Sequence, residues 1–149
     1  NPYFYELYGQ ALLEAGHAAA AIPPLERAVK LAPDPALIQI ELAQAMVASN
    51  SGKMVDTAIP LLHAALIKEP ESADAYTQLA MAYGRKNDLA DADLASAQAA
   101  FARGDNKTAR ELAARAKLRF PIGSPGWVRA DDIVAFNKFA KKNPLSIGH

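Results

Sequence analysis

The residue types that carry most enzyme chemistry are scarce and scattered in this sequence. It contains three histidines, His17, His63 and His149, and no cysteine, which excludes thiol nucleophiles, thiolate metal ligands and disulfides. No histidine has a second histidine or a carboxylate at a metal-ligand spacing, and the HExxH, GxSxG, P-loop and GxGxxG patterns are absent. We therefore predict that this chain has no catalytic residue, binds no metal and needs no cofactor.

Neighbouring carboxylates are the nearest approach to a catalytic pair. Asp91 lies two residues from Asp93, and Asp131 is followed by Asp132, but side chains at these spacings diverge on a helix. We expect them to be solvated or to cap helices. Trp127 could belong to a ligand cage, although its place in the repeat pattern described below favours a core position.

Composition and charge narrow the class of partner. The 149 residues suit one domain, and sixteen basic side chains balance sixteen acidic ones. A neutral overall field argues against nucleic acid or an anionic membrane as the partner. No apolar run reaches the roughly 20 residues that span a bilayer, and no signal-like segment opens the sequence, so we expect an excised domain.

Aromatic, small and proline positions recur in a fixed order with a period close to 34 residues, which is the length of a tetratricopeptide repeat (TPR). Successive blocks end at Pro33, Pro70 and Pro121. The spacing from Pro33 to Pro70 is 37 residues. The residues in excess of the 34-residue repeat fall in a turn-forming cluster at 49–53. The second spacing is 51 residues, so one helix, near 89–103, must serve two repeats.

This register predicts an all-α fold, a TPR superhelix of about eight antiparallel helices. The repeat domain is expected over 1–142, with repeats at about 2–35, 36–72 and 73–103, a half repeat at 104–121, a capping helix at 125–141, and a tail at 143–149. The helices are expected near 3–15, 19–31, 36–49, 55–68, 73–86, 89–103, 106–119 and 126–141. An ordinary helical bundle is the alternative, and contact between its first and last helices would identify it.

Small residues are expected where paired helices approach closely, and large ones between successive pairs. The small positions are Gly9, Ala21, Ala28, Ala43, Ala58, Ala65 and Ala80. The large positions are Tyr5, Leu12, Ile22, Leu25, Leu62, Leu79 and Tyr83. Prolines at 23, 24 and 60 should make the second helix of each pair start late or bend, because a proline inside a helix clashes with the carbonyl four residues back.

The first helix of each TPR pair is expected to line the concave face, with one side free to bind protein or peptide segments. The candidate contact residues are Tyr3, Glu6, Gln10, Leu13, Glu14, Leu37, Ile40, Glu41, Gln44, Val47, Asp74, Thr77, Gln78, Met81 and Arg85. Since Arg85 is their only basic member, we expect an apolar or basic segment rather than an acidic tail. The alternative is that neighbouring repeats or another domain already cover the apolar members, among them Leu13, Leu37, Ile40 and Val47.

The charges are unevenly distributed along the chain. Residues 1–75 carry four basic and nine acidic side chains, a net charge of −5, and the remainder carries +5. A second candidate surface is therefore the basic helix near 106–119, which could bind an acidic surface or could simply be solvated. Its basic residues, with the one just before it, are Arg103, Lys107, Arg110, Arg115, Lys117 and Arg119.

Some short segments go beyond the general TPR pattern. They are AYGRK at 82–86, DLASA at 93–97, GSPGW at 123–127 and the opening NPYFYEL at 1–7. With them the chain resembles, over nearly its whole length, the C-terminal TPR region of bacterial periplasmic zinc metalloproteases of the HExxH type. That group includes the beta-barrel assembly-enhancing protease.

The resemblance implies a periplasmic location and a catalytic zinc in a protease domain that is missing from this chain. It also implies a TPR surface that holds substrates, the protease domain itself or outer-membrane assembly components. No residue here matches the zinc-ligand motif, so no site residue is carried over, and the irregular third repeat departs from the pattern. A free-standing TPR adaptor or oligomerisation domain, for which the cytoplasm would be possible, is the alternative.

Overall fold

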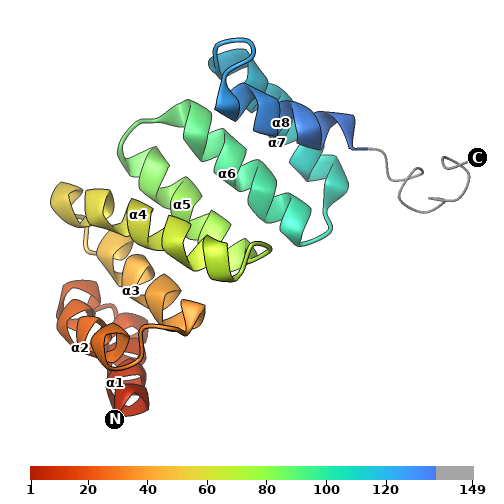
Figure 1. The fold of residues 1–149 in the computed structure, drawn as a ribbon. Helices are drawn as coiled ribbons and strands as arrows, with labels where there is room; N and C mark the ends of the chain where they lie inside the picture. The colour runs from red at the N-terminus through yellow and green to blue at the C-terminus, as the bar shows by residue number, and fades with distance from the viewer. Residues whose placement is uncertain (137–149) are drawn as a thin grey trace, which may run out of the picture.

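The chain folds entirely into helices in the part that the structure describes. The computed structural model describes residues 1–136, which contain eight α-helices and no strand. The helices are α1 (Pro2–Glu14), α2 (Ala18–Leu31), α3 (Ala36–Ala48), α4 (Gly52–Lys68), α5 (Ala73–Arg85), α6 (Leu89–Ala102), α7 (Asn106–Arg119) and α8 (Pro125–Ala135). They follow one another along the molecule in chain order (Figure 1). The predicted all-α class is confirmed.

Side-chain caps fix where most of these helices begin. The Ser124 hydroxyl accepts a hydrogen bond from the Trp127 backbone N–H, and Pro125 occupies the first helical position, as the sequence predicts. Asn1, Ser51, Ser72, Asp88 and Asp105 cap their helices in the same way. Two helices are followed by glycines with positive φ, Gly16 (84°) and Gly104 (82°), a conformation that costs glycine little.

The expected start holds closely for α2 and less well for α4. α2 begins at Ala18, one residue before the expected start, and α4 begins at Gly52, three residues before it. Both helices include their prolines, each of which removes one intrahelical N–H donor. The last helix, expected to reach residue 141, ends at Ala135. The rest of that expected helix from residue 137, and the expected tail at 143–149, lie outside the described residues.

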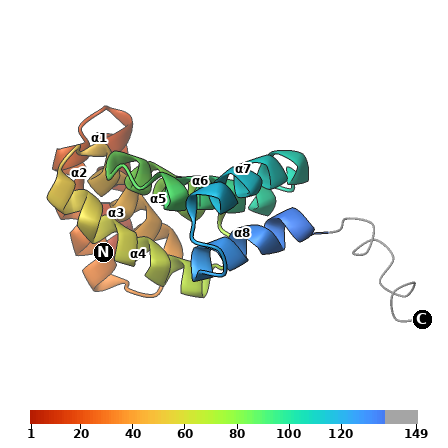
Figure 2. The same ribbon diagram turned by 90° about the horizontal axis from the view of Figure 1, so that it is seen from above.

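The helices pack mainly against their neighbours in sequence. α1 also contacts α3, and α3 contacts α5, whereas beyond that point the even-numbered α6 and α8 contact each other. α6 packs against both α5 and α7 about as closely as α1 packs against α2. Within residues 1–136, α1 and α8 do not touch, so the helices do not close into a bundle (Figures 1 and 2).

Buried residues in the described part of the chain form two clusters. The larger joins residues of α2 to α5, with Leu12 of α1 packed against it, and includes Ala95 of α6. The smaller joins α6, α7 and α8 and includes Leu94 and Ala97 of α6. α6 therefore contributes to both.

The predicted small positions are largely buried, as expected. Ala21, Ala28, Ala43, Ala58 and Ala65 are fully buried, while Ala80 is half-buried. Gly9 is buried where α1 crosses α2, and a Cβ atom there would lie 2.5 Å from Leu25 Cγ. That separation is too short for a side chain, so the contact of α1 with α2 requires glycine.

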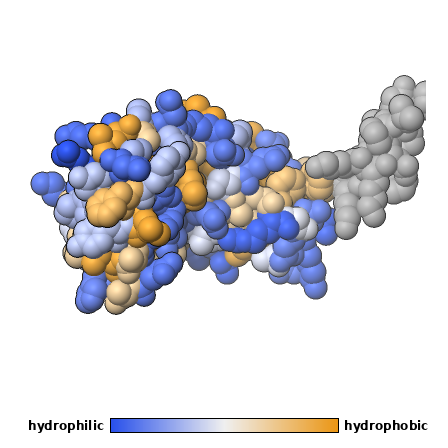
Figure 3. Space-filling view, turned by 90° about the horizontal axis from the view of Figure 1, so that it is seen from below, coloured by the Kyte–Doolittle hydropathy of each residue, from blue (hydrophilic) through white to orange (hydrophobic). Residues whose placement is uncertain are grey.

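Hydrophobic groups also remain on the surface. On the face in Figure 3 they form patches separated by hydrophilic side chains. On α1, Tyr3, Phe4, Leu7 and Tyr8 are 54–67% exposed. None of the helices in residues 1–136 is long and apolar enough to cross a membrane.

Candidate protein-binding site

The predicted contact residues fall into three groups in the structure. The exposed members are Tyr3, Glu14, Leu37, Gln44, Asp74, Met81 and Arg85. The half-buried ones are Glu6, Gln10, Leu13, Thr77 and Gln78. Ile40, Glu41 and Val47 are buried.

The expected exposure of Ile40 and Val47 is wrong. Both lie in the larger core cluster, because α3 contacts α1, α2, α4 and α5 and is covered on most sides. Along α3 only a narrow stripe stays exposed, consisting of Leu37, Gln44 and Ala48. Ile40 and Val47 are therefore part of the core, as the alternative expected, whereas Leu37 is exposed and Leu13 is half-buried.

A small cavity of about 240 Å³ lies between α1 and α3. All five of its lining residues come from the predicted set: Gln10, Leu13, Glu14, Glu41 and Gln44. The Gln10 side-chain amide donates a hydrogen bond of 2.5 Å to Glu41 Oε1. Burial, together with the charge of Glu6 and a hydrogen bond to it, raises the pKa of Glu41 to about 7, although the bond from Gln10 opposes this shift.

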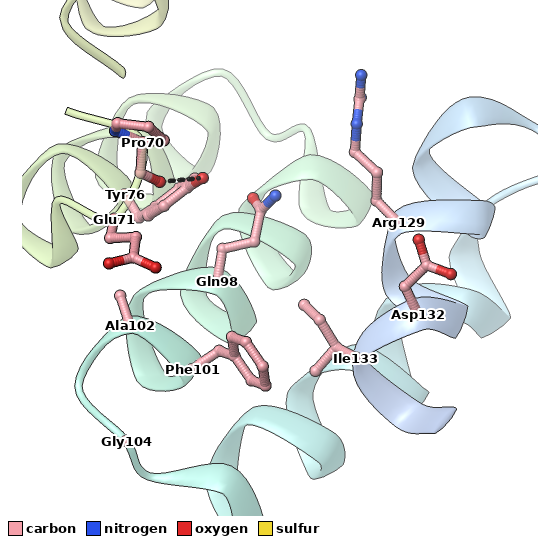
Figure 4. A pocket seen from close by; sticks show the side chains of 10 residues that line it. All are labelled: Pro70, Glu71, Tyr76, Gln98, Phe101, Ala102, Gly104, Arg129, Asp132 and Ile133. Atoms are coloured by element: carbon pink, nitrogen blue, oxygen red, sulfur yellow. Dashed lines mark hydrogen bonds between the residues drawn. The ribbon is translucent and has the colours of Figure 1, made fainter. Parts of the chain in front are cut away.

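A longer groove lies between α5 and α8, with α6 as its floor (Figure 4). It consists of two adjoining cavities of about 530 and 330 Å³ that share Tyr76, Gln98 and Arg129. α5 and α8 both contact α6 without contacting each other in the described chain, which leaves the space between them open. The larger cavity is lined by Pro70, Glu71, Tyr76, Gln98, Phe101, Ala102, Gly104, Arg129, Asp132 and Ile133.

Hydrogen bonds orient the aromatic side chains of this groove. The Tyr76 hydroxyl donates to the Pro70 carbonyl oxygen at 3.2 Å, as drawn in Figure 4. The Tyr83 hydroxyl lies 3.2 Å from His63 Nε2 in the smaller cavity. Both hydroxyl groups are therefore already engaged within the molecule, while the tyrosine side chains line the groove.

The Arg129 side chain lines the groove close to three groups whose pKa is raised. Burial raises the pKa of Tyr76 and Tyr83, and burial with the hydrogen bond to Asp88 raises that of Asp91 to about 6. The charge of Arg129 acts against all three shifts, so its guanidinium is near each of them. No carboxylate in residues 1–136 forms an ion pair with Arg129.

The sequence analysis missed this groove because it considered the first helix of each pair and the basic helix near 106–119, but not α6 with the last helix. Gln98 and Phe101 lie on α6, and Arg129 and Ile133 lie on α8. The available signal was the long spacing from Pro70 to Pro121, which places an extra helix and changes which helices face inward.

The predicted basic surface is mostly engaged within the molecule. Arg115 and Arg119 both form ion pairs with Asp93. Asp93 is buried, whereas we expected it to be solvated or to cap a helix. Lys117 pairs with Asp131 at 2.7 Å and lies 4.7 Å from the ring centre of Trp127, which is half-buried.

Arg103 donates to the Thr77 hydroxyl at 2.7 Å. Of the six basic residues, Lys107 and Arg110 alone form no ion pair or side-chain hydrogen bond among residues 1–136. Two separate cations make a much smaller docking surface than the sequence suggests.

No model of a known protein family matches the chain, and a comparison with curated proteins finds no match. The function must therefore be argued from the geometry and from the sequence itself.

Proposed function

We propose that this chain is a TPR-type protein-interaction module that binds an extended segment of a partner protein in the groove between α5 and α8. The observation that carries the proposal is that two cavities adjoin between α5 and α8, since they share Tyr76, Gln98 and Arg129. Together they offer apolar groups, two tyrosines, an amide, a histidine, the Arg129 guanidinium and the carboxyl groups of Glu71, Asp91 and Asp132. An extended peptide needs such apolar groups for its side chains and a few polar groups for its backbone.

The packing of the first helices supports the TPR assignment. α1, α3 and α5 contact one another in turn, while α2 and α4 pack on their outer side without mutual contact. This arrangement agrees with the recurring order of small, aromatic and proline positions. We propose that these repeats form a short superhelix whose regular alternation ends at α6.

The resemblance to periplasmic HExxH zinc metalloproteases supports a more specific role. In this proposal the module belongs to such a protease and holds substrates or outer-membrane assembly components near a catalytic domain that contains the zinc. The alternative, an adaptor or oligomerisation domain, is favoured by the exposed aromatic and aliphatic side chains of α1, Tyr3, Phe4, Leu7 and Tyr8.

The groove can be tested by filling it. Ala102 lines the larger cavity from the last turn of α6 and is exposed, so Ala102→Trp would place an indole in the groove without entering the core. We expect this variant to lose about tenfold or more in affinity for peptides bound by the wild type, because the indole occupies the surface that the peptide needs. Binding would be measured on an array of 15-residue peptides that tile several unrelated proteins, followed by titration of the best binders.

Ala114→Trp is the matched control, since Ala114 is exposed on α7 and does not line the groove. It should bind like the wild type. Circular dichroism would show that both variants fold. Equal binding by wild type and Ala102→Trp, or no peptide binding by the wild type, would rule out the groove.

A further inference from the structure

One side of α1 is exposed and almost entirely apolar. The exposed residues of this helix recur at spacings of three and four, so they lie on the same side. We call this side the α1 face, and it consists of Tyr3, Phe4, Leu7, Tyr8, Ala11 and Glu14. Glu14, in the last turn, is its only charged member.

No helix in residues 1–136 covers the α1 face. α1 contacts α2 and α3 alone, and Gly9, on the opposite side of α1 from the face, lies against Leu25 of α2. Figure 1 shows α1 and α2 at one end of the molecule, away from α7 and α8. Four large apolar side chains within two helical turns form a contiguous patch, and such patches mark interaction sites.

The area of the α1 face suits a small interface between two copies. An aromatic side chain has about 150–250 Å² to bury, so four large side chains that are 54–67% exposed leave on the order of 450 Å² open to water. Pairing two copies buries the same face on each, which removes roughly 900 Å² before flanking residues are included. Specific interfaces begin at about 1,000 Å², so two α1 faces with their flanking residues reach the lower end of this range.

The α1 face is complementary to itself in shape. Phe4 and Ala11 lie at equal distances along the helix from a centre between Leu7 and Tyr8. Two α1 helices that pair antiparallel about this centre place the Phe4 ring of each copy against the small Ala11 of the other. Leu7 of each copy then lies beside Tyr8 of the other. Only a second copy makes use of this symmetry, because an unrelated partner presents a different surface.

Charged residues next to the α1 face also match in an antiparallel pair. Gly9 lies against Leu25, and the ring of Tyr5 lies 5.6 Å from the Arg27 guanidinium, so α2 runs antiparallel to α1. Arg27, and Lys30 one turn further along α2, are therefore near the first turn of α1, at the opposite end from Glu14.

None of Glu14, Arg27 and Lys30 forms an ion pair within residues 1–136. Antiparallel pairing brings Glu14 of each copy to the first turn of α1 of the other copy, beside Arg27 and Lys30. Opposite charges at both ends of the pair favour this register over a parallel one.

We infer that the α1 face binds a second copy of this chain, with the two α1 helices antiparallel about a twofold axis. The inference goes beyond the proposed function and does not depend on it, because no residue of α1 lines the groove between α5 and α8. The dimer carries two such grooves. A partner with two suitable segments is therefore held more strongly by the dimer than by one copy.

The oligomeric state of the 149-residue chain tests the inference. Sedimentation equilibrium would be measured from about 2 to 200 µM, because an interface of this size predicts a monomer–dimer equilibrium with a dissociation constant on the order of 10 µM. Leu7→Glu places like charges at the centre of the pair and should weaken the dimer by about tenfold or more. Leu7 is exposed, so the variant should fold, and circular dichroism would check this.

Ile67→Glu is the matched control. Ile67 is an exposed aliphatic residue of α4 that lies outside the α1 face, so this variant carries the same kind of substitution elsewhere on the surface. It should dimerise like the wild type.

A charge exchange tests the antiparallel arrangement. Glu14→Lys places a lysine beside Lys30 of the second copy at both ends of the pair and should weaken the dimer about fivefold. Adding Lys30→Glu to this variant restores opposite charges at both ends and should return the affinity to near the wild-type value.

The inference is overturned if the wild type stays monomeric at the highest concentration, which would assign the α1 face to a different protein or domain. It is also overturned if Leu7→Glu dimerises like the wild type, or if the exchanged pair binds no better than Glu14→Lys alone. Ala102→Trp should dimerise normally, and Leu7→Glu should bind single peptides normally. Failure of the dimer therefore leaves the peptide groove standing, and failure of the groove leaves the dimer standing.

Discussion

Two buried carboxyl groups, Glu41 and Asp93, lie in opposite electrostatic surroundings. Asp93 accepts hydrogen bonds from Arg115 Nε and Nη2, at 3.0 and 2.7 Å, and from Arg119 Nε at 3.0 Å. Glu41 has one amide donor, from Gln10, and a second carboxyl group nearby. Asp93 is thus paired with two guanidinium groups, whereas the surroundings of Glu41 favour a bound proton.

Glu41 should make the stability of the protein depend on pH. Its pKa is raised from 4.5 to about 7 on folding, chiefly by burial, so the folded state binds more protons than the unfolded state between these values. The protonated Glu41 side chain can be buried at lower cost than the ionised one. Its contribution to the free energy of unfolding is fully present below about pH 4.5 and is lost as the pH rises through 7. Relative to Glu41→Gln, the wild type should lose on the order of 1–2 kcal/mol of unfolding free energy across this window, after allowance for partial solvent screening.

Urea denaturation of both proteins at pH 4.5 and pH 8 would measure this difference. Glu26→Gln serves as the control and should follow the wild type. If the difference in unfolding free energy between the wild type and Glu41→Gln stays constant with pH, the pKa of Glu41 is not raised on folding.

For single residues, the sequence predicted which side chains share a face of the molecule better than it predicted whether they are buried. It placed Gln10, Glu41 and Gln44 together on one face, and the structure brings them to one cavity. It did not predict that Glu41 is buried, because helical spacing indicates a face but not how many neighbouring helices cover it. The partners of Asp93 lie 22 and 26 residues further along the chain, beyond the reach of any local pattern.

Among the elements, α1 and α5 use glycine for different reasons. Gly9 lies against the fully buried Leu25 side chain, so an added methyl group has no space. Gly84 lies in the last turn of α5 with no atom within 4 Å of an added Cβ atom. The first glycine is required by packing, and the second is not.

Alanine substitutions should therefore have opposite signs at the two positions. Gly9→Ala forces α1 away from α2 and should cost about 1–3 kcal/mol, the usual range for overpacking. Gly84→Ala should add about 0.5–1 kcal/mol, because alanine restricts the unfolded chain and favours helix. Thermal and urea denaturation would measure both, and a loss of stability in Gly84→Ala would show that its surroundings are tighter than the structure indicates.

Most helices could be predicted from the sequence, since caps, prolines and small residues are local signals. Ser124 and Pro125 mark the beginning of α8 clearly. The start of α4 could not be placed as well, because Pro60 suggested a late start while Ser51 provides a cap three residues earlier than expected. A proline on an exposed side of a helix can be accommodated once packing elsewhere holds the helix, and packing is not visible in a local pattern.

For the whole molecule, the two core clusters predict two units of different stability. The cluster of α6 to α8 is smaller and is built largely of alanines, with Leu94 and Ile133 as its large buried members. The ion pairs of Asp93 with Arg115 and Arg119 join α6 to α7 beside it. This part of the molecule should depend on those ion pairs more than the larger cluster does.

Asp93→Asn tests this dependence. Removing the carboxylate leaves two half-exposed arginines without their partner and should destabilise the α6–α8 unit by about 2–3 kcal/mol, less than for a fully buried pair. Amide hydrogen exchange should accelerate in α7 and α8 and stay nearly unchanged in α1 to α4. Asp34→Asn, at an exposed loop position, is the control. Uniform acceleration along the chain would show instead that the two clusters unfold as one unit.

The double role of α6 also constrains how such a chain can change in evolution. Up to α5 the odd-numbered helices contact one another in turn, so a segment encoding two helices could be gained or lost without changing this series. At α6 the series of contacts passes to the even-numbered helices, since α6 contacts α8 and α5 does not contact α7 in the described residues. A change in the coding sequence by one helix, not two, would produce such a shift, and a later change of two helices on either side would preserve it. The groove between α5 and α8 would thus be inherited as a unit with that one odd helix.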